Sequence, residues 1–271
     1  MRILKYIFDF YIQSSLHVAL AVYALIRMTF FKLNISYDES VAYFGFFGTI
    51  VGYNFIKYDE LARVKKIKLT KTFKAIIFLS VISAIATFYY FLELKTKTKL
   101  IGIGSLLLTI LYTLPFFPNR TNMRNWTGLK IYLVVIAWVG VTVLLPVINA
   151  EVNFSIIIVI KCIQRFLLVF VMMLIFEIID LQFDIKSLET IPQKIGIKKS
   201  KLLAYLLVVL FLSLEYFKPN ITINQFVEIF LISIILVLFT YFANSKRNKY
   251  YTSFWVESVP FFWFILFLIF S

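Results

Sequence analysis

The residues of this sequence best suited to chemistry are three carboxylates, Glu177, Asp180 and Asp184. They are three and four residues apart, so a helix would place them on one face over about two turns. They directly follow an eleven-residue run without a polar side chain, FLLVFVMMLIF. Acidic groups at the mouth of a membrane helix are costly and tend to mark function, and their oxygens suit a hard cation such as Mg2+. The cluster therefore predicts a metal-assisted site for a phosphorylated lipid.

The composition is that of a polytopic membrane protein. Of the 271 residues, 61% are hydrophobic and 15% charged, and the mean hydropathy is +0.89, whereas soluble domains are about half apolar and about a quarter charged. The net charge of +14 would suit nucleic acid. The basic residues alternate with apolar spans, however, so we expect no nucleic-acid partner and assign them to topology and to lipid headgroups. The single Cys162 excludes an internal disulfide, and the single His17 excludes a multi-histidine metal site.

Nine stretches are apolar and close to the roughly 20 residues that a spanning helix needs. They lie at about residues 11–31, 40–57, 74–92, 98–116, 129–148, 154–179, 201–217, 222–243 and 253–270. The sequence shows no internal repeat, low-complexity tract or soluble domain, so residues 1–271 are predicted to form a single polytopic membrane domain. We expect an all-α membrane protein with nine transmembrane helices in a single bundle.

The basic residues also predict the orientation. With the N-terminus in the cytoplasm, 20 of the 28 Lys and Arg residues face that side, five face the other and three lie within spans. Lys and Arg resist translocation, so the N-terminus and the acidic cluster are predicted to be cytoplasmic. No signal-peptide cleavage site or transit peptide is evident, which favours a multi-pass protein of a bacterial plasma membrane.

Two segments resemble a known family. Asp180-x-x-x-Asp184 is followed by Glu189–Pro192 (Glu-Thr-Ile-Pro) and Gly196, and the linker from Tyr112–Pro115 to Gly128–Lys130 joins the fourth and fifth spans. With the nine spans and the topology, these residues resemble the UbiA superfamily of intramembrane prenyltransferases. The resemblance covers essentially the whole chain, and it implies that the helices surround a central cavity.

The resemblance implies a reaction and a set of site residues. An isoprenyl diphosphate would ionise, and a lipophilic, usually aromatic, acceptor would capture the carbocation. Asp180 and Asp184 would bind Mg2+, and Glu177 would be a third ligand or a proton acceptor. The leaving diphosphate needs basic partners, and the candidates on the cytoplasmic face are Lys57, Arg120, Arg124, Lys186 and Lys194.

The first acidic motif of the family is altered in this chain. Asn54 matches it, but Tyr58 and Ala62 stand where the family has aspartates. Asp59 and Glu60 are one and two residues past the first of those positions, and one residue is a rotation of roughly 100° on a helix. Asn54 and Asp59 are candidate phosphate or cation contacts; for Asn54 the alternative is an interhelical hydrogen bond.

Two other functions are open at this point. The altered motif suggests a non-catalytic relative that binds a polyprenyl lipid or a partner protein. Charged residues at membrane depth suggest a secondary transporter, although the repeats and broken spans common in transporters are not evident. Among those residues, Arg165 should pair structurally with a buried acid, Glu228 or Glu257, and His17 is a third polar group at depth.

Overall fold

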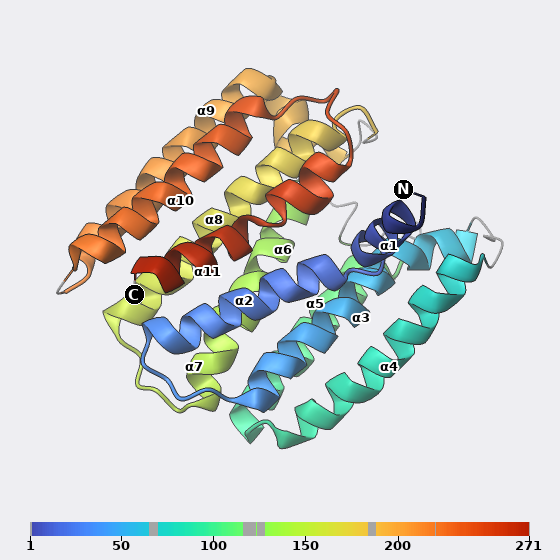
Figure 1. Ribbon diagram of the computed structural model, residues 1–271, viewed down its shortest axis with the longest axis horizontal. Helices are drawn as coiled ribbons and strands as arrows, with labels where there is room; N and C mark the ends of the chain where they lie inside the picture. The colour runs from blue at the N-terminus through green and yellow to red at the C-terminus, as the bar shows by residue number, and fades with distance from the viewer. Residues whose placement is uncertain are drawn as a thin grey trace. The chain divides into compact units, whose positions relative to one another are not determined.

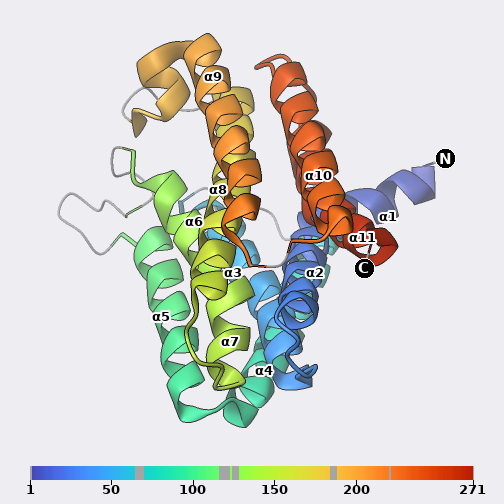
Figure 2. The ribbon, with the colours of Figure 1, turned by 90° about the vertical axis from the view of Figure 1, so that its left-hand side faces the viewer.

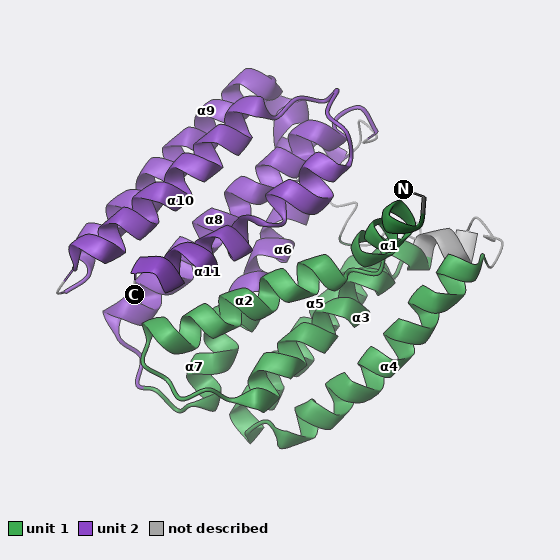
Figure 3. Ribbon diagram, in the orientation of Figure 1, with its two compact units in different colours: residues 1–123, 140–152 green, residues 124–139, 153–271 purple. Residues whose placement is uncertain are grey.

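The chain folds into helices (Figure 1). A computed structural model describes residues 2–64, 70–115, 123, 128–183, 188–219 and 221–270, with only the backbone of residues 2 and 60–64. No strand occurs among these residues, which confirms the all-α fold class. The helices form two compact units, residues 1–123 with 140–152 and residues 124–139 with 153–271 (Figure 3).

Six helical segments are long and apolar enough to cross a membrane. They are Lys71–Glu93, Lys130–Asn149, Ile156–Asp180, Ile191–Phe217, Ile223–Phe242 and Tyr251–Phe270. A seventh is the pair Ile3–Gln13 and Leu16–Lys32 if the two are counted as one bent span. A multi-pass membrane protein is thereby confirmed over the described residues, while the number nine and the orientation stay predictions.

The first unit contains α1 to α5, a π-helical turn and α7. Their bounds are Arg2–Gln13, Leu16–Lys32, Glu39–Val64, Lys71–Glu93 and Thr96–Thr113, then Gly140–Leu144 for the turn and Leu145–Asn149 for α7. The long helix α3 packs against α2, α4 and α5. Gly45 of α3 lies against the buried side chain of Ile26, and Gly102 of α5 faces Phe44. Small residues let helix backbones approach closely where no side chain can be accommodated.

A break separates α1 from α2. Ser15 has a φ of 62°, in the left-handed region, and the two helices are bent by 57° at this point. Such a residue cannot continue a right-handed helix, so the chain turns there. Ser14 and Ser15 are fully buried, and their polar groups therefore need hydrogen-bond partners within the protein.

A polar network in the first unit joins the start of α3, the start of α5 and the end of α7. Asp38 accepts the backbone N–H of Val41 at 3.1 Å, which caps the start of α3, and the side-chain amide of Asn149 donates to Asp38 at 2.7 Å. Asn149 in turn accepts the backbone N–H of Lys95 at 3.0 Å. The Lys95 ammonium lies 2.9 Å from a carboxylate oxygen of Glu151 and, by hydrogen bond and charge, holds the pKa of that carboxyl below its ordinary value.

The second unit is built around α8. Its helices are α6 (Lys130–Val139), α8 (Ile156–Asp180), α9 (Ile191–Ser213) with a 3-10 turn (Leu214–Phe217), α10 (Ile223–Phe242), a π-helical turn (Tyr251–Val256) and α11 (Val259–Phe270). Helix α8 packs against α6, α9 and α10, and α9 and α10 run side by side (Figure 2). More than half of the apolar stretch of α8 is buried, because it is the helix that the others surround.

Two buried charges of this unit contact one tryptophan. The guanidinium of Arg165 lies 5.3 Å from the centre of the Trp263 ring, and the indole N–H donates to the carboxylate of Glu228. Arg165, Glu228 and Trp263 are all buried. Trp263 thus contacts Arg165 by a cation–π interaction and Glu228 by a hydrogen bond. A direct pairing of Arg165 with Glu228 or Glu257 stays a prediction.

Candidate functional site

The acidic end of α8 is the first part of the candidate site. Glu177 is buried, and Asp180, the last residue of α8, is half-buried. A carboxylate oxygen of Glu177 accepts the backbone N–H of Ile191 at 3.2 Å. Ile191 is the first residue of α9, so the carboxylate satisfies a donor that the helix itself cannot, at the positive end of the helix dipole. This bond ties the end of α8 to the start of α9.

The start of α9 accounts for the Thr-Ile-Pro and Gly pattern. The side chain of Gln193 accepts the backbone N–H of Thr190 at 3.0 Å, and Pro192 occupies the first turn, where its missing N–H costs nothing. Gly196 then has φ 79° and ψ 161°, a conformation almost confined to glycine. The motif thus encodes one capped helical turn, a break and then the body of α9.

Lys194 is on this first turn. Its ammonium lies 2.8 Å from a carboxylate oxygen of Glu189, and both side chains are about half exposed, at 50% and 53%. An exposed pair of this kind contributes little to stability, because water and salt screen it. Lys194, which the sequence predicts to bind phosphate, can therefore leave Glu189 for an anionic ligand at small cost.

A second cluster surrounds Asn54 in the first unit. The Ser15 hydroxyl donates to the Asn54 amide oxygen at 2.8 Å, and the Asn54 amide nitrogen donates to the Ser80 hydroxyl at 2.9 Å. The Lys57 ammonium donates to Ser15 at 3.1 Å and to the backbone oxygen of Ile12 at 3.4 Å. The interhelical hydrogen bond considered for Asn54 is present, and it links α4 to the break between α1 and α2.

Tyr58 also serves this break. Its hydroxyl donates to the backbone oxygen of Gln13 at 2.9 Å. One turn of α3 therefore supplies polar partners to the break where α1 ends and α2 begins; its residues are Asn54, Lys57 and Tyr58. Ser15 and Ser80 of this cluster were not predicted from the sequence, where the one signal for them is the Ser14-Ser15 pair between two apolar runs.

The remaining predicted site residues are placed only in part. Asp59 is in α3 with a half-buried side chain, and Glu60 is described by its backbone alone. Asp184, Lys186, Arg120 and Arg124 lie outside the described residues. Within the residues that the structure does describe, no three His, Cys, Asp or Glu side chains come together as metal ligands.

The donor chemistry at the end of α8 nevertheless suits Mg2+. Mg2+ in proteins is held by one or two carboxylates together with waters and substrate phosphates, rather than by a full protein cage. Glu177 and Asp180 present carboxylates three residues apart on one helix, and the half-buried Asp180 is at the helix end. The residues present fit this ion as protein ligands for a phosphate-bound metal.

The fold and this acidic helix end together define an all-helical, multi-pass membrane protein of the UbiA type of fold. A UbiA homolog from Aeropyrum pernix K1 aligns with a TM-score of 0.60 and 16% identity, over 96% of this chain and 97% of that one. A structure of digeranylgeranylglyceryl phosphate synthase in membranes aligns with a TM-score of 0.59 and 19% identity, over 99% and 98% of the two chains. No protein-family model and no curated protein sequence matches the chain. The resemblance predicted from the sequence is thus confirmed for the fold.

Proposed function

We propose that this protein is a membrane prenyltransferase that transfers an isoprenyl group from an isoprenyl diphosphate to a lipophilic acceptor. The observation that carries the proposal is the full-length fold similarity to a UbiA homolog, combined with the carboxylates that end α8. We further propose that residues 1–271 act as one membrane domain with nine spans and a cytoplasmic N-terminus, in a bacterial plasma membrane. The strong bias of Lys and Arg supports that orientation.

The chemistry assigns roles to named residues. The bond between the isoprenyl carbon and the diphosphate oxygen breaks, the oxygen keeps the electron pair, and the acceptor forms a new bond to the carbon as it loses a proton. Asp180 and Asp184 would hold Mg2+, which neutralises charge on the leaving diphosphate. Glu177 holds the start of α9 and is a candidate third ligand or proton acceptor. Further diphosphate contacts are proposed for Asn54, Lys57, Arg124 and Lys194, and a contact with the bound cation is proposed for Asp59.

Substitution of Asp180 tests the proposal. The protein, reconstituted in liposomes with Mg2+, is given labelled isoprenyl diphosphates of several chain lengths and a panel of lipophilic acceptors. We expect Asp180→Asn to reduce turnover by about a hundredfold or more, because a metal contributes several kcal/mol to transition-state stabilisation and each factor of ten is about 1.4 kcal/mol. Glu189→Gln is the matched control, since it removes one exposed carboxylate nearby in the sequence, and it should stay within about twofold. Full turnover by the Asp180→Asn variant would contradict the assignment.

The contacts of Asn54, Lys57 and Tyr58 favour a second candidate. All three residues bind the break between α1 and α2, and two of them, Asn54 and Tyr58, are at positions of the altered motif. A non-catalytic protein of the same fold, which binds a polyprenyl lipid or a partner protein, would need these residues only for its structure. It would bind an isoprenyl diphosphate without forming product, and any alkylated acceptor from the same panel would exclude it.

A further inference from the structure

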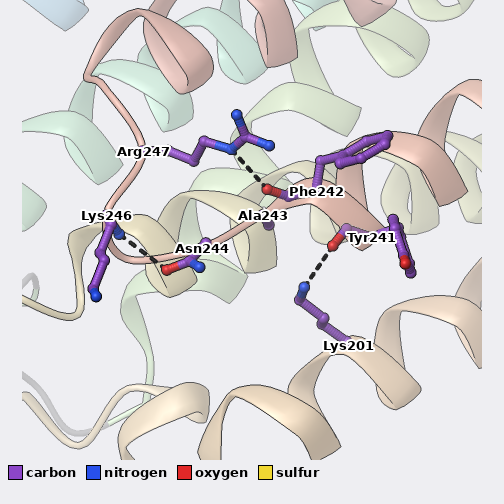
Figure 4. A pocket seen from close by; sticks show the side chains of 7 residues that line it. All are labelled: Lys201, Tyr241, Phe242, Ala243, Asn244, Lys246 and Arg247. Carbon is purple, nitrogen blue, oxygen red and sulfur yellow. Dashed lines mark hydrogen bonds between the residues drawn. The ribbon is translucent and has the colours of Figure 1, made fainter.

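An open, basic cavity lies between α9 and the end of α10. It has a volume of about 600 Å3 and is lined by Lys201, Tyr241, Phe242, Ala243, Asn244, Lys246 and Arg247. Figure 4 shows Lys201 reaching from α9 toward the last turn of α10, and Lys246 and Arg247 on the segment that follows that turn. The cavity is distinct from the acidic end of α8, since no residue of α8 lines it.

The cavity collects positive charge without acidic lining. Three of its seven lining residues are basic and none is acidic. The acids of these helices lie toward their other ends: Glu215 is 14 residues after Lys201, and Glu228 is 13 residues before Tyr241. At 1.5 Å per residue each separation is about 20 Å along a helix. Like charges that share a cavity repel one another, so an anion there would be favoured.

Two of the cations are held in place by the end of α10. The Lys201 ammonium donates to the backbone oxygen of Tyr241 at 2.6 Å, and the Arg247 Nε–H donates to the backbone oxygen of Phe242 at 3.0 Å. These carbonyls end a helix and lack intrahelical partners, and the helix dipole is negative there. Arg247 also lies 5.3 Å from the centre of the Tyr251 ring, which fixes the plane of its guanidinium. The cations are thus oriented before any ligand binds.

Hydrogen-bond donors remain for that ligand. In the described part of the chain, the terminal amino groups of Arg247 and the ammonium of Lys246 make no hydrogen bond. The paired N–H groups of a guanidinium match two oxygens of a phosphate. Tyr241 and Phe242 are 64% and 49% exposed beside the cations, and exposed aromatic rings next to basic residues are typical of the membrane–water interface.

We propose that this cavity binds the phosphate of an anionic lipid headgroup. Arg247 and Lys246 contact the phosphate oxygens, Lys201 adds the third positive charge, and Tyr241 and Phe242 lie beside the first part of the acyl chains. The bias of Lys and Arg predicts that this segment faces the cytoplasm, where anionic lipids of the inner leaflet are available. The site is independent of the proposed transferase reaction.

Lipid titration of the full-length protein in a neutral detergent tests the site. Native mass spectrometry gives the dissociation constant of the first bound phosphatidylglycerol, with phosphatidylcholine as the neutral reference. We expect phosphatidylglycerol to bind at least about tenfold more tightly, and Lys201→Gln/Arg247→Gln to lower its affinity by about 25-fold, since each cation near an anionic lipid contributes about fivefold. The Lys246 ammonium makes no hydrogen bond within the described residues. Lys246→Gln should therefore lower the phosphatidylglycerol affinity by about fivefold without affecting the fold.

A matched control separates a built site from diffuse charge. Lys198 and Lys199 are exposed on α9 and do not line the cavity. Lys198→Gln/Lys199→Gln therefore removes two positive charges, as many as Lys201→Gln/Arg247→Gln, and should change the phosphatidylglycerol affinity by less than about twofold. Equal losses in the two double variants, or equal binding of the two lipids, would overturn the proposal. The dissociation constants of glycerol 3-phosphate and inorganic phosphate are measured in the same way. If either binds as tightly as the whole lipid, the cavity takes free phosphate and the lipid assignment is wrong.

Discussion

The hydrogen bonds of Asn54 offer the sharpest test of how the altered motif is used. Asn54→Leu keeps the branched shape of the side chain but removes the bonds to Ser15 and Ser80, at 2.8 and 2.9 Å. Ser80→Ala removes the second of these bonds, together with the intrahelical bond that the Ser80 hydroxyl donates to the backbone oxygen of Ile76 at 2.8 Å. Ser83→Ala is the control one turn further along α4: Ser83 is buried, whereas Ser80 is half-buried, and the Ser83 hydroxyl has no hydrogen-bond partner among the described residues.

The expected magnitudes follow from the number of interhelical bonds lost, two for Asn54→Leu and one for Ser80→Ala. A buried hydrogen bond contributes about 0.5–1.5 kcal/mol to stability, and interhelical bonds in membrane proteins average about 0.6 kcal/mol. Asn54→Leu should therefore lower the free energy of unfolding by about 1–3 kcal/mol, and Ser80→Ala by about 0.5–1.5 kcal/mol. Ser83→Ala should be neutral or slightly stabilising, because it removes an unsatisfied buried hydroxyl.

Unfolding in mixed micelles, by titration with a denaturing detergent, measures these free energies. The double variant Asn54→Leu/Ser80→Ala should show a coupling of about 0.6 kcal/mol, the value of one shared bond. If Ser80→Ala and Ser83→Ala unfold alike, or if the coupling is zero, the bond at the helix break does not stabilise the protein and the reasoning fails. If Asn54 also contacts the substrate, Asn54→Leu should raise the half-saturating concentration of isoprenyl diphosphate, whereas Ser80→Ala should not.

Three further substitutions test the packing. Gly45→Ala should lower the free energy of unfolding by about 1–2 kcal/mol through overpacking. At Gly104 an added Cβ meets no atom within 4 Å, so Gly104→Ala should raise the free energy of unfolding by up to about 1 kcal/mol through helix propensity. Thermal unfolding of the two variants in parallel measures both effects, and equal shifts in melting temperature would contradict the prediction. Gly196→Ala should cost about 1–3 kcal/mol, because a Cβ strains this backbone conformation, and a melting temperature equal to wild type would show that α9 has no break there. Trp263→Phe should lower the free energy of unfolding by about 1–3 kcal/mol, since the buried Glu228 loses a hydrogen-bond donor. Unfolding in detergent measures this change, with Phe262→Leu as the neighbouring control. Equal losses of stability in the two variants would show that the bond to Glu228 does not stabilise the protein.

The altered first motif shows where sequence reasoning stops. Counting along the chain placed Asn54, Tyr58 and Asp59 at the end of a helix and compared them with a family pattern. It could not find that Tyr58 donates to Gln13, 45 residues away, or that Asn54 binds Ser15, 39 residues away. Such partners depend on how helices pack, and no local periodicity encodes them.

Local signals, in contrast, were enough for most of the architecture. Apolar runs of spanning length marked the helices, because lipid forces backbone polar groups to pair within each segment. The Thr-Ile-Pro pattern and Gly196 entered the prediction only through the family resemblance, although the capped turn and the break that they form depend on a few neighbouring residues. The sequence by itself thus determined an all-helical membrane protein with an acidic helix end. Only the tertiary structure decided that Glu177 holds the start of α9, that Trp263 lies between Arg165 and Glu228, and that three cations share a cavity, because each depends on atoms that the chain brings together from distant positions.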